Sequence, residues 1–103
     1  MQTHSASRIE IIIEQPALRA LTRQLDRAGV KGYTVLPVFG GHGQSGPWTA
    51  EGEIGSAGGM VAVLTMVSPE RAEGVLDSVF EVVSRHIGLV SVSECRVVRP
   101  ERV

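Results

Sequence analysis

The sequence predicts an α+β protein of the ferredoxin-like class, with strands and helices in the order β-α-β-β-α-β. Four stretches rich in alternating or β-branched apolar residues predict strands, and two stretches with apolar residues at spacings of three and four predict helices. In this order, two right-handed β-α-β units form a four-stranded antiparallel sheet with both helices on one face. The length of 103 residues, with 43% hydrophobic and 20% charged, predicts a single globular domain over residues 1–103.

The first half of the chain predicts a strand, a helix and a second strand. In residues 8–13, isoleucines at alternate positions predict a strand with one fully buried face. Pro16 opens a helix whose leucines recur at spacings of three and four, and Gly29 ends it. Residues 32–39 are rich in β-branched and aromatic side chains and predict the second strand. Pro37 cannot donate a ladder hydrogen bond, so it indicates a bulge or a sheet edge there.

The second half predicts a strand, a longer helix and a last strand. Residues 60–67 are apolar on both alternating faces, which is typical of a strand in the interior of a sheet. A helix follows with Ser68 as its N-cap, Gly88 ends it, and residues 89–98 predict the fourth strand. The stripe expected to face the sheet consists of Ala72, Val75, Leu76, Val79, Phe80, Val83 and Ile87.

The sheet face opposite the helices is expected to be an interface between copies of the chain. Both predicted helices cover one face only, so the remaining apolar side chains of residues 8–13 and 60–67 would face water in a monomer. An exposed apolar patch of that size on a small domain usually marks an oligomer interface. We therefore expect a homo-oligomer in which sheets pack together.

Composition excludes several classes of function. The formal net charge of -1 argues against nucleic-acid binding, which needs a strong positive field. Cys95 is the single cysteine, so no internal disulfide is possible, and the N-terminal residues do not resemble a secretory signal. No apolar run approaches the roughly 20 residues that span a bilayer. We expect a cytoplasmic protein that is peripheral to a membrane at most.

A glycine-rich segment, residues 40–59, separates the second and third predicted strands and contains eight of the twelve glycines. Gly41, Gly43 and Gly46 match G-x-G-x-x-G, but a dinucleotide-binding turn requires a helix directly after the glycines, and here a strand follows. A Walker loop is excluded because residues 32–70 contain no lysine or arginine. Two interpretations remain: a connection without function, or a loop whose free glycine amides bind an anion.

Residues 8–35, RIEIIIEQPALRALTRQLDRAGVKGYTV, resemble the opening strand and helix of the PII signal-transduction family. The family's Gly-x-Thr-Val signature is matched by Gly32, Tyr33, Thr34 and Val35. The resemblance implies a ferredoxin-like fold, a homotrimer, and a long connection between the second and third strands, the T-loop, at about residues 41–58 here.

The resemblance also implies an adenine-nucleotide site in each cleft between subunits. Ile12 would lie against the adenine, the Gly32–Val35 segment would read the base, and the T-loop base would face the phosphates. Arg99, and Arg102 displaced by one position, would supply positive charge after the last strand. The implied nucleotide-site residues are Ile12, Gly32, Tyr33, Thr34, Val35, Gly40, Gly41, His42, Gly43, Gln44, Gly88, Arg99 and Arg102.

Several departures from the family pattern indicate which branch of the family the chain resembles. The turn before the last strand is short and lacks the family's phosphate-binding lysine, and the T-loop has no tyrosine and no arginine before its glutamine. These features resemble the PII-like branch associated with carboxysomes and bicarbonate transporters, whose members bind ADP or AMP and in some cases bicarbonate. Bicarbonate would then contact Gly41, His42, Gly43, Gln44 and Ser45. The implied partner is a bicarbonate transporter or a carboxysome-related protein, with no cofactor, no metal and no enzymatic activity.

Two other functions are compatible with the same fold. An acylphosphatase-like hydrolase would use an arginine and an asparagine at a phosphate cradle, but the chain has no asparagine. A metal-tolerance trimer would carry more aromatic and carboxylate residues than this chain, which is 4% aromatic. His42 is either solvated or an anion donor, and His86 is expected to complement the C-terminal end of the second helix. Trp48 either contacts a partner or folds back on its own subunit.

Overall fold

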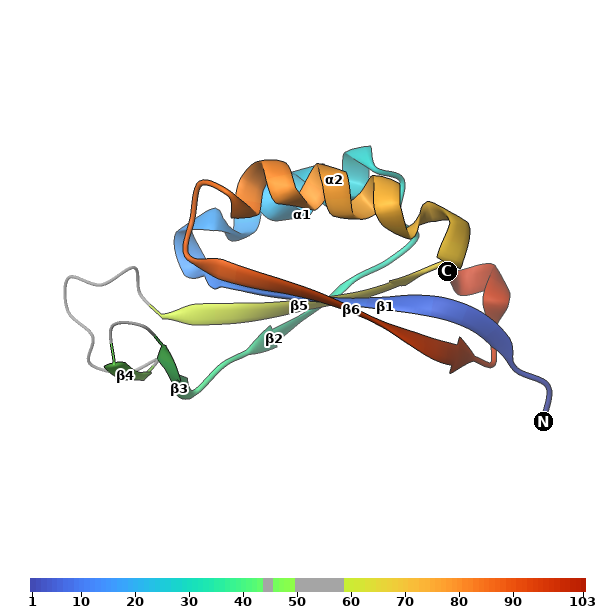
Figure 1. The fold of residues 1–103 in the computed structure, drawn as a ribbon, viewed down its shortest axis with the longest axis horizontal. Coiled ribbons are helices and arrows are strands. Elements are labelled where there is room, and N and C mark those ends of the chain that lie inside the picture. Colours follow the sequence, from blue (N-terminus) through green and yellow to red (C-terminus); the bar gives the residue numbers. More distant parts are fainter. Residues whose placement is uncertain (44–45, 50–58) are drawn as a thin grey trace.

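The fold is a two-layer α/β sandwich, given by a computed structural model that describes residues 1–43, 46–49 and 59–103 (Figure 1). The strands are β1 (His4–Glu14), β2 (Thr34–Pro37), β3 (Gly40–Gly43), β4 (Gly46–Thr49), β5 (Met60–Val67) and β6 (Gly88–Val97). The α-helices are α1 (Leu18–Arg27) and α2 (Ala72–Val83), and the single-turn 3-10 helices are η1 (Gln15–Ala17), η2 (Pro69–Arg71) and η3 (Pro100–Arg102). The body is elongated, with extents of 47 × 28 × 19 Å.

The main sheet has the strand order β2-β5-β1-β6, and every neighbouring pair is antiparallel. Both α-helices lie over the same face of it (Figure 1). The predicted ferredoxin-like α+β class is therefore confirmed. The position of β5 between β2 and β1 confirms that residues 60–67 form an interior strand. Pro37 ends β2, an edge strand, where its missing N–H costs no ladder hydrogen bond.

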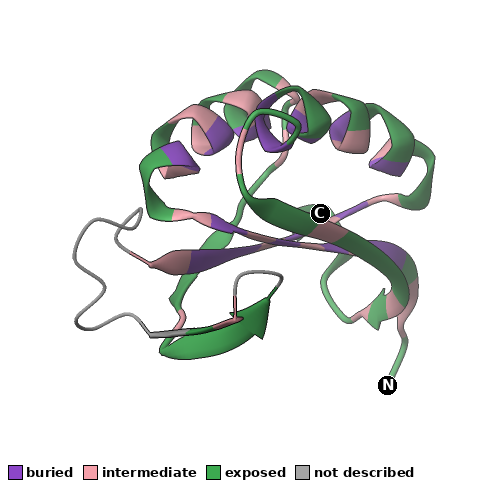
Figure 2. Ribbon diagram, turned by 60° about the vertical axis from the view of Figure 1, so that its left-hand side comes forward, coloured by how far each residue is buried: buried purple, intermediate pink, exposed green. Residues whose placement is uncertain are grey.

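The core lies between the helices and the odd-numbered residues of β1. Ile9, Ile11 and Ile13 are all 0% exposed, as are Leu21 and Leu25 of α1. Side chains alternate between the two faces of a strand, so each second residue of β1 enters this core. Figure 2 shows the buried positions on the inner sides of the helices and along the central strands. The alternating isoleucines and the leucine stripe were predicted correctly.

The ends of the helices differ in part from the prediction. Gly29 lies just after α1 with φ +76°, a conformation that favours glycine, so its role at the helix end is confirmed. Ser68 precedes η2 but its side chain makes no capping hydrogen bond, so the predicted N-cap is absent. Gly88 does not end α2: the helix stops at Val83 and Gly88 is the first residue of β6.

The predicted stripe of α2 was wrong at two positions. Phe80 is 64% exposed and Ile87 is 69% exposed, whereas Val82 is buried instead. The face of α2 toward the sheet carries Val75, Val79 and Val82. Because an α-helix has 3.6 residues per turn, Phe80 follows Val79 about 100° further around the helix axis and lies on the flank of the helix. Ile87 lies beyond the end of α2, where the helical spacing no longer applies.

The second face of the sheet carries apolar and charged side chains and no helix among the described residues. The even-numbered residues of β1 point to this open face. The registers place Leu36 of β2 and Leu89 of β6 on it in the same row as Ile12, with Ala62 between Leu36 and Ile12. Leu36 is 42% exposed and Leu89 is 69% exposed. The open face is therefore available for contact with another copy of the chain. In the described parts of the chain, no helix is long and apolar enough to cross a membrane.

Substitution of Leu21 by alanine tests whether a core position contributes more to stability than a position on the helix flank. We expect Leu21→Ala to lower the free energy of unfolding by about 2–5 kcal/mol, because a fully buried side chain leaves a cavity. Phe80→Ala is the matched control and should cost less than about 1 kcal/mol, because its ring is mostly exposed. Urea denaturation at fixed protein concentration measures both. An equal cost for the two variants would contradict the observed orientation of α2.

Candidate functional site

The residues implied by the sequence fall into two groups, and only the arginines of the second group lie at the opposite end of the sheet from the first. Val35 is level with Ile11 and Val90, one ladder position from Ile12 and Leu89. The first, the loop-end group, consists of Ile12, Gly40–Gly43 and Gly88, where β1 ends and β6 begins. Ile13 lies opposite Gly88 in the ladder, and Ile12 lies opposite Leu89. The β3–β4 hairpin lies beyond β2 at the same end of the molecule (Figure 1). Gln44 and Ser45 lie outside the described residues, as does the T-loop over residues 50–58.

The base of the predicted T-loop is more regular than the sequence indicated. Gly40–Gly43 form β3 and pair with β4 in an antiparallel ladder, with Gly43 opposite Gly46. Gly46 has φ +100°, but none of the glycines of β3 has positive φ. A nest of successive amides needs the left-handed conformation, so β3 does not form one. In an extended strand, alternate amides point away from the partner strand, and these could meet an anion.

The second group, the tail-end group, consists of Gly32–Val35 with Arg99 and Arg102. Thr65 Oγ1 donates a hydrogen bond of 2.6 Å to the Gly32 carbonyl, which fixes this segment against β5. Lys31 Nζ donates to the Glu101 carbonyl at 3.2 Å and links the segment to η3. Figure 1 shows η3 at the end of the molecule opposite the β3–β4 hairpin. Arg99 and Arg102 are exposed.

One chain does not bring the two groups together. Nine strand steps separate Gly88 from Val97 along β6, which is about 30 Å at 3.3 Å per residue, and Arg99 lies beyond Val97. A nucleoside diphosphate is too short to contact both Gly88 and Arg99 of the same chain. Sequence reasoning placed the C-terminal arginines in one cleft with the T-loop base, and that arrangement requires a second copy of the chain.

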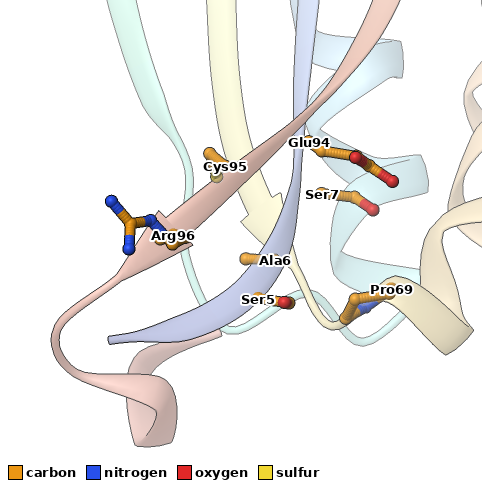
Figure 3. Close-up of a pocket in the computed structure, with 7 residues that line it drawn as sticks. All are labelled: Ser5, Ala6, Ser7, Pro69, Glu94, Cys95 and Arg96. Atoms are coloured by element: carbon orange, nitrogen blue, oxygen red, sulfur yellow. The ribbon is translucent and has the colours of Figure 1, made fainter. Parts of the chain in front are cut away.

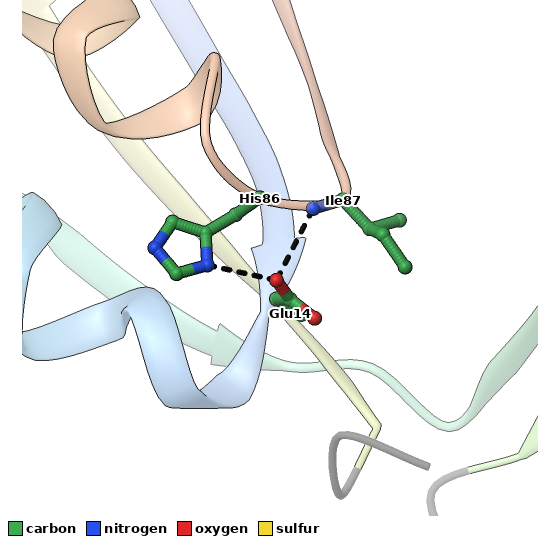
Figure 4. Close-up of polar contacts among 3 residues, drawn as sticks. All are labelled: Glu14, His86 and Ile87. Carbon is green, nitrogen blue, oxygen red and sulfur yellow. Dashed lines mark hydrogen bonds and ion pairs between the residues drawn. The ribbon is translucent and has the colours of Figure 1, made fainter.

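A contact that sequence reasoning missed supports the loop-end group. Glu14 Oε2 lies 2.8 Å from His86 Nδ1 and accepts a hydrogen bond of 3.2 Å from the Ile87 amide (Figure 4). The side chains of Glu14 and His86 are 16% and 31% exposed, so the pair is partly shielded from water. His86 lies beyond the end of α2, and its expected role at the helix terminus is replaced by this contact with β1. The contact fixes the turn that leads into Gly88.

A separate hollow of about 330 Å³ lies near the start of β1 and the end of β6 (Figure 3). It is lined by Ser5, Ala6, Ser7, Pro69, Glu94, Cys95 and Arg96. Cys95 is half-exposed there. The hollow contains none of the residues of the two groups. Within the described ranges, no cluster of three or more His, Cys, Asp or Glu side chains could hold a metal ion.

The fold, with its long glycine-rich connection between β2 and β5, defines the class of a ferredoxin-like protein of the PII type. The chain belongs to the nitrogen regulatory protein P-II family, which matches residues 6–102. A search of the curated proteins finds no match. Solved structures, in contrast, match over nearly the whole chain.

Two similar structures are of CPII, a nitrogen regulatory PII-like protein from Thiomonas intermedia K12. One is bound to ADP, AMP and bicarbonate, has a TM-score of 0.85 and 28% identity, and covers 98% of this chain and 95% of that chain. The other is bound to ADP and bicarbonate, with a TM-score of 0.82, 30% identity and coverage of 98% and 96%. A putative PII-like signaling protein from Thermus thermophilus matches at 25% identity and a TM-score of 0.74, covering 99% and 98%.

Substitution of Gly88 tests how closely β6 approaches β1 at the loop end. A Cβ at Gly88 would lie 2.9 Å from the Ile12 carbonyl oxygen, so the two strands must separate to admit it. We expect Gly88→Ala to cost about 1–3 kcal/mol of stability in thermal or urea unfolding.

The matched control for Gly88→Ala is Gly74→Ala. A Cβ at Gly74, inside α2, meets nothing within 4 Å, so this change should stabilise by about 0.5–1 kcal/mol through helix propensity. Unchanged stability of Gly88→Ala would show that the backbone contact with β1 is looser than described.

Proposed function

We propose that this protein is a non-enzymatic regulator that binds ADP or AMP in clefts between the subunits of a homotrimer. The separation of Gly88 from Arg99 and Arg102 by about 30 Å along β6 carries the proposal. Membership of the P-II family supports it, as do the structures of CPII bound to ADP. The nucleotide would contact the loop-end group of one subunit and the tail-end group of the next.

Charge distribution supports a shared site. A nucleoside diphosphate brings several negative charges, but residues 32–70 contain no lysine or arginine, and Glu14 adds a carboxylate at the loop end. Apart from the exposed Arg85 in the turn before Gly88, the loop-end group therefore has to obtain positive charge from elsewhere. Arg99 and Arg102 of a neighbouring subunit can supply it, because arginine forms strong charge-assisted hydrogen bonds with phosphate.

Ring assembly follows from the same geometry. An interface that joins one end of a subunit to the other end of its neighbour is heterologous, and such an interface generates a cyclic ring when its rotation closes and an open filament when it does not. The open face of the sheet, with Leu36 and Leu89 exposed, provides apolar surface for burial in the assembly. A trimer, as implied by the family resemblance, would contain three equivalent clefts.

Bicarbonate is the second ligand that we propose, beside the nucleotide phosphate. Gly41, His42 and Gly43 are exposed on β3, and with Gln44 and Ser45 they would offer amide and side-chain donors to the anion. Bicarbonate and ADP occur together in the CPII structure that resembles this chain. The state of both ligands would set the conformation of the T-loop. The proposed partner, which would respond to this conformation, is a bicarbonate transporter or a carboxysome-related protein. We propose that the chain itself is cytoplasmic.

Alanine substitution of the tail arginines tests the phosphate assignment. We expect Arg99→Ala to weaken ADP binding about tenfold in isothermal titration calorimetry, and Arg99→Ala with Arg102→Ala to weaken it further, because charge-assisted contacts to phosphate are lost. Arg23→Ala is the control: Arg23 is exposed on α1, far from both groups, and its loss removes the same charge. ADP affinity that is equal in all variants would rule out the arginines as phosphate ligands.

Coupling between ADP and bicarbonate tests the second ligand. Because two ligands that share the donors of β3 alter each other's free energy of binding, we expect bicarbonate to tighten ADP binding by at least about fivefold. ADP must then tighten bicarbonate binding by the same factor. The titrations are run at constant pH and ionic strength, with chloride as the control anion. Identical ADP affinity in both salts would contradict a joint site.

A further inference from the structure

We infer that Lys31 is a positioning residue that holds the C-terminal segment so that Arg99 and Arg102 can meet the nucleotide phosphates. This inference rests on the proposed function and extends it to a residue outside the implied nucleotide site. Lys31 is the only lysine in the sequence. It lies in the connection between α1 and β2, directly before Gly32.

The contact of Lys31 joins two segments that are distant in sequence. Its Nζ donates a hydrogen bond of 3.2 Å to the backbone carbonyl of Glu101, 70 positions further along the chain. Among the described residues, this is the one hydrogen bond that ties residues 99–103 to another part of the chain. A single 3-10 turn such as η3 has little stability of its own. Lys31 therefore provides the side-chain hydrogen bond that helps to hold η3 against the rest of the chain.

Glu101 contacts both Lys31 and Arg99, so the position of Glu101 also affects that of the Arg99 side chain. While its carbonyl accepts from Lys31, its carboxylate Oε2 accepts from Arg99 Nε at 3.1 Å. This contact uses the inner nitrogen of the guanidinium and leaves the two terminal nitrogens for a ligand. The side chain of Arg99 is 64% exposed, so these two terminal nitrogens are accessible to a ligand from solvent. The Arg102 amide donates to the Arg99 carbonyl at 3.1 Å, which places both arginines on one turn.

Preorganisation is the physical benefit of this arrangement. A free arginine side chain loses rotamer entropy when a ligand immobilises it, and a tail that is already held in place avoids part of that cost. The same lysine precedes the Gly32–Val35 segment, so the segment that would read the base and the arginines that would contact phosphate are held as one unit. Loss of the Lys31 contact should weaken the recognition of phosphate but not that of the base.

The test compares ADP with adenosine, which lacks phosphate, on the full chain. We expect Lys31→Ala to raise the calorimetric Kd for ADP about fivefold while the Kd for adenosine stays unchanged, since an exposed ion-dipole contact is of modest strength. Lys31→Arg keeps a long cationic donor and should restore most of the ADP affinity. Arg23→Ala is the charge-matched control and should match the unaltered chain for both ligands. Melting temperatures without ligand should be alike in all variants.

A double-mutant cycle distinguishes positioning from direct contact. In the Arg99→Ala, Arg102→Ala background, Lys31→Ala should cause no further loss of ADP affinity, because Lys31 acts through those arginines. A further fivefold loss in that background would mean that Lys31 itself contacts phosphate and would overturn the inference. Unchanged ADP affinity of Lys31→Ala would also overturn it, while the proposed function would stand. No ADP binding by the unaltered chain would overturn both.

Discussion

The alternation of side chains along β1 determines how the rest of the molecule is arranged. Ile9, Ile11 and Ile13 are fully buried beneath the helices, so the residues between them must point to the open face. The same strand pairs with β5 on one side and β6 on the other. A slip of one residue would expose the isoleucines and reverse both faces of the sheet. Burial of one face of β1 thus fixes the register of the central strands.

The proposed site depends on this register as well. The ladder places Gly88 opposite Ile13 at one end of the sheet, and the length of β6 carries Arg99 to the other end. Helices on one face leave the other face free for contact between copies (Figure 2). The separation of the two groups and the open face together favour a ring of subunits. Function in this account belongs to the assembly, because each chain provides half of two different clefts.

Local patterns in the sequence predicted most of the fold, and contacts between distant residues account for what was missed. Alternating isoleucines indicated β1, and continuous apolar character indicated that β5 is an interior strand. The end of α2 at Val83 has no glycine or proline signal, so helical spacing was extended too far and Ile87 was assigned to the core, whereas Phe80 lies within α2 on its exposed flank. Glu14 and His86 are 72 positions apart, and Lys31 and Glu101 are 70 apart. No local pattern marks such pairs, although the register of Ile13 with Gly88 places Glu14 beside the turn that contains His86.

A crystal structure of the ADP complex would show directly whether two subunits share the nucleotide. We predict three chains in a ring, with each ADP between two of them. Its adenine should lie between Ile12 of one subunit and the Gly32–Val35 segment of the next, and its phosphates should contact Arg99 of that second subunit. ADP held entirely by residues of one chain, or in the hollow beside Cys95 and Arg96, would contradict the account.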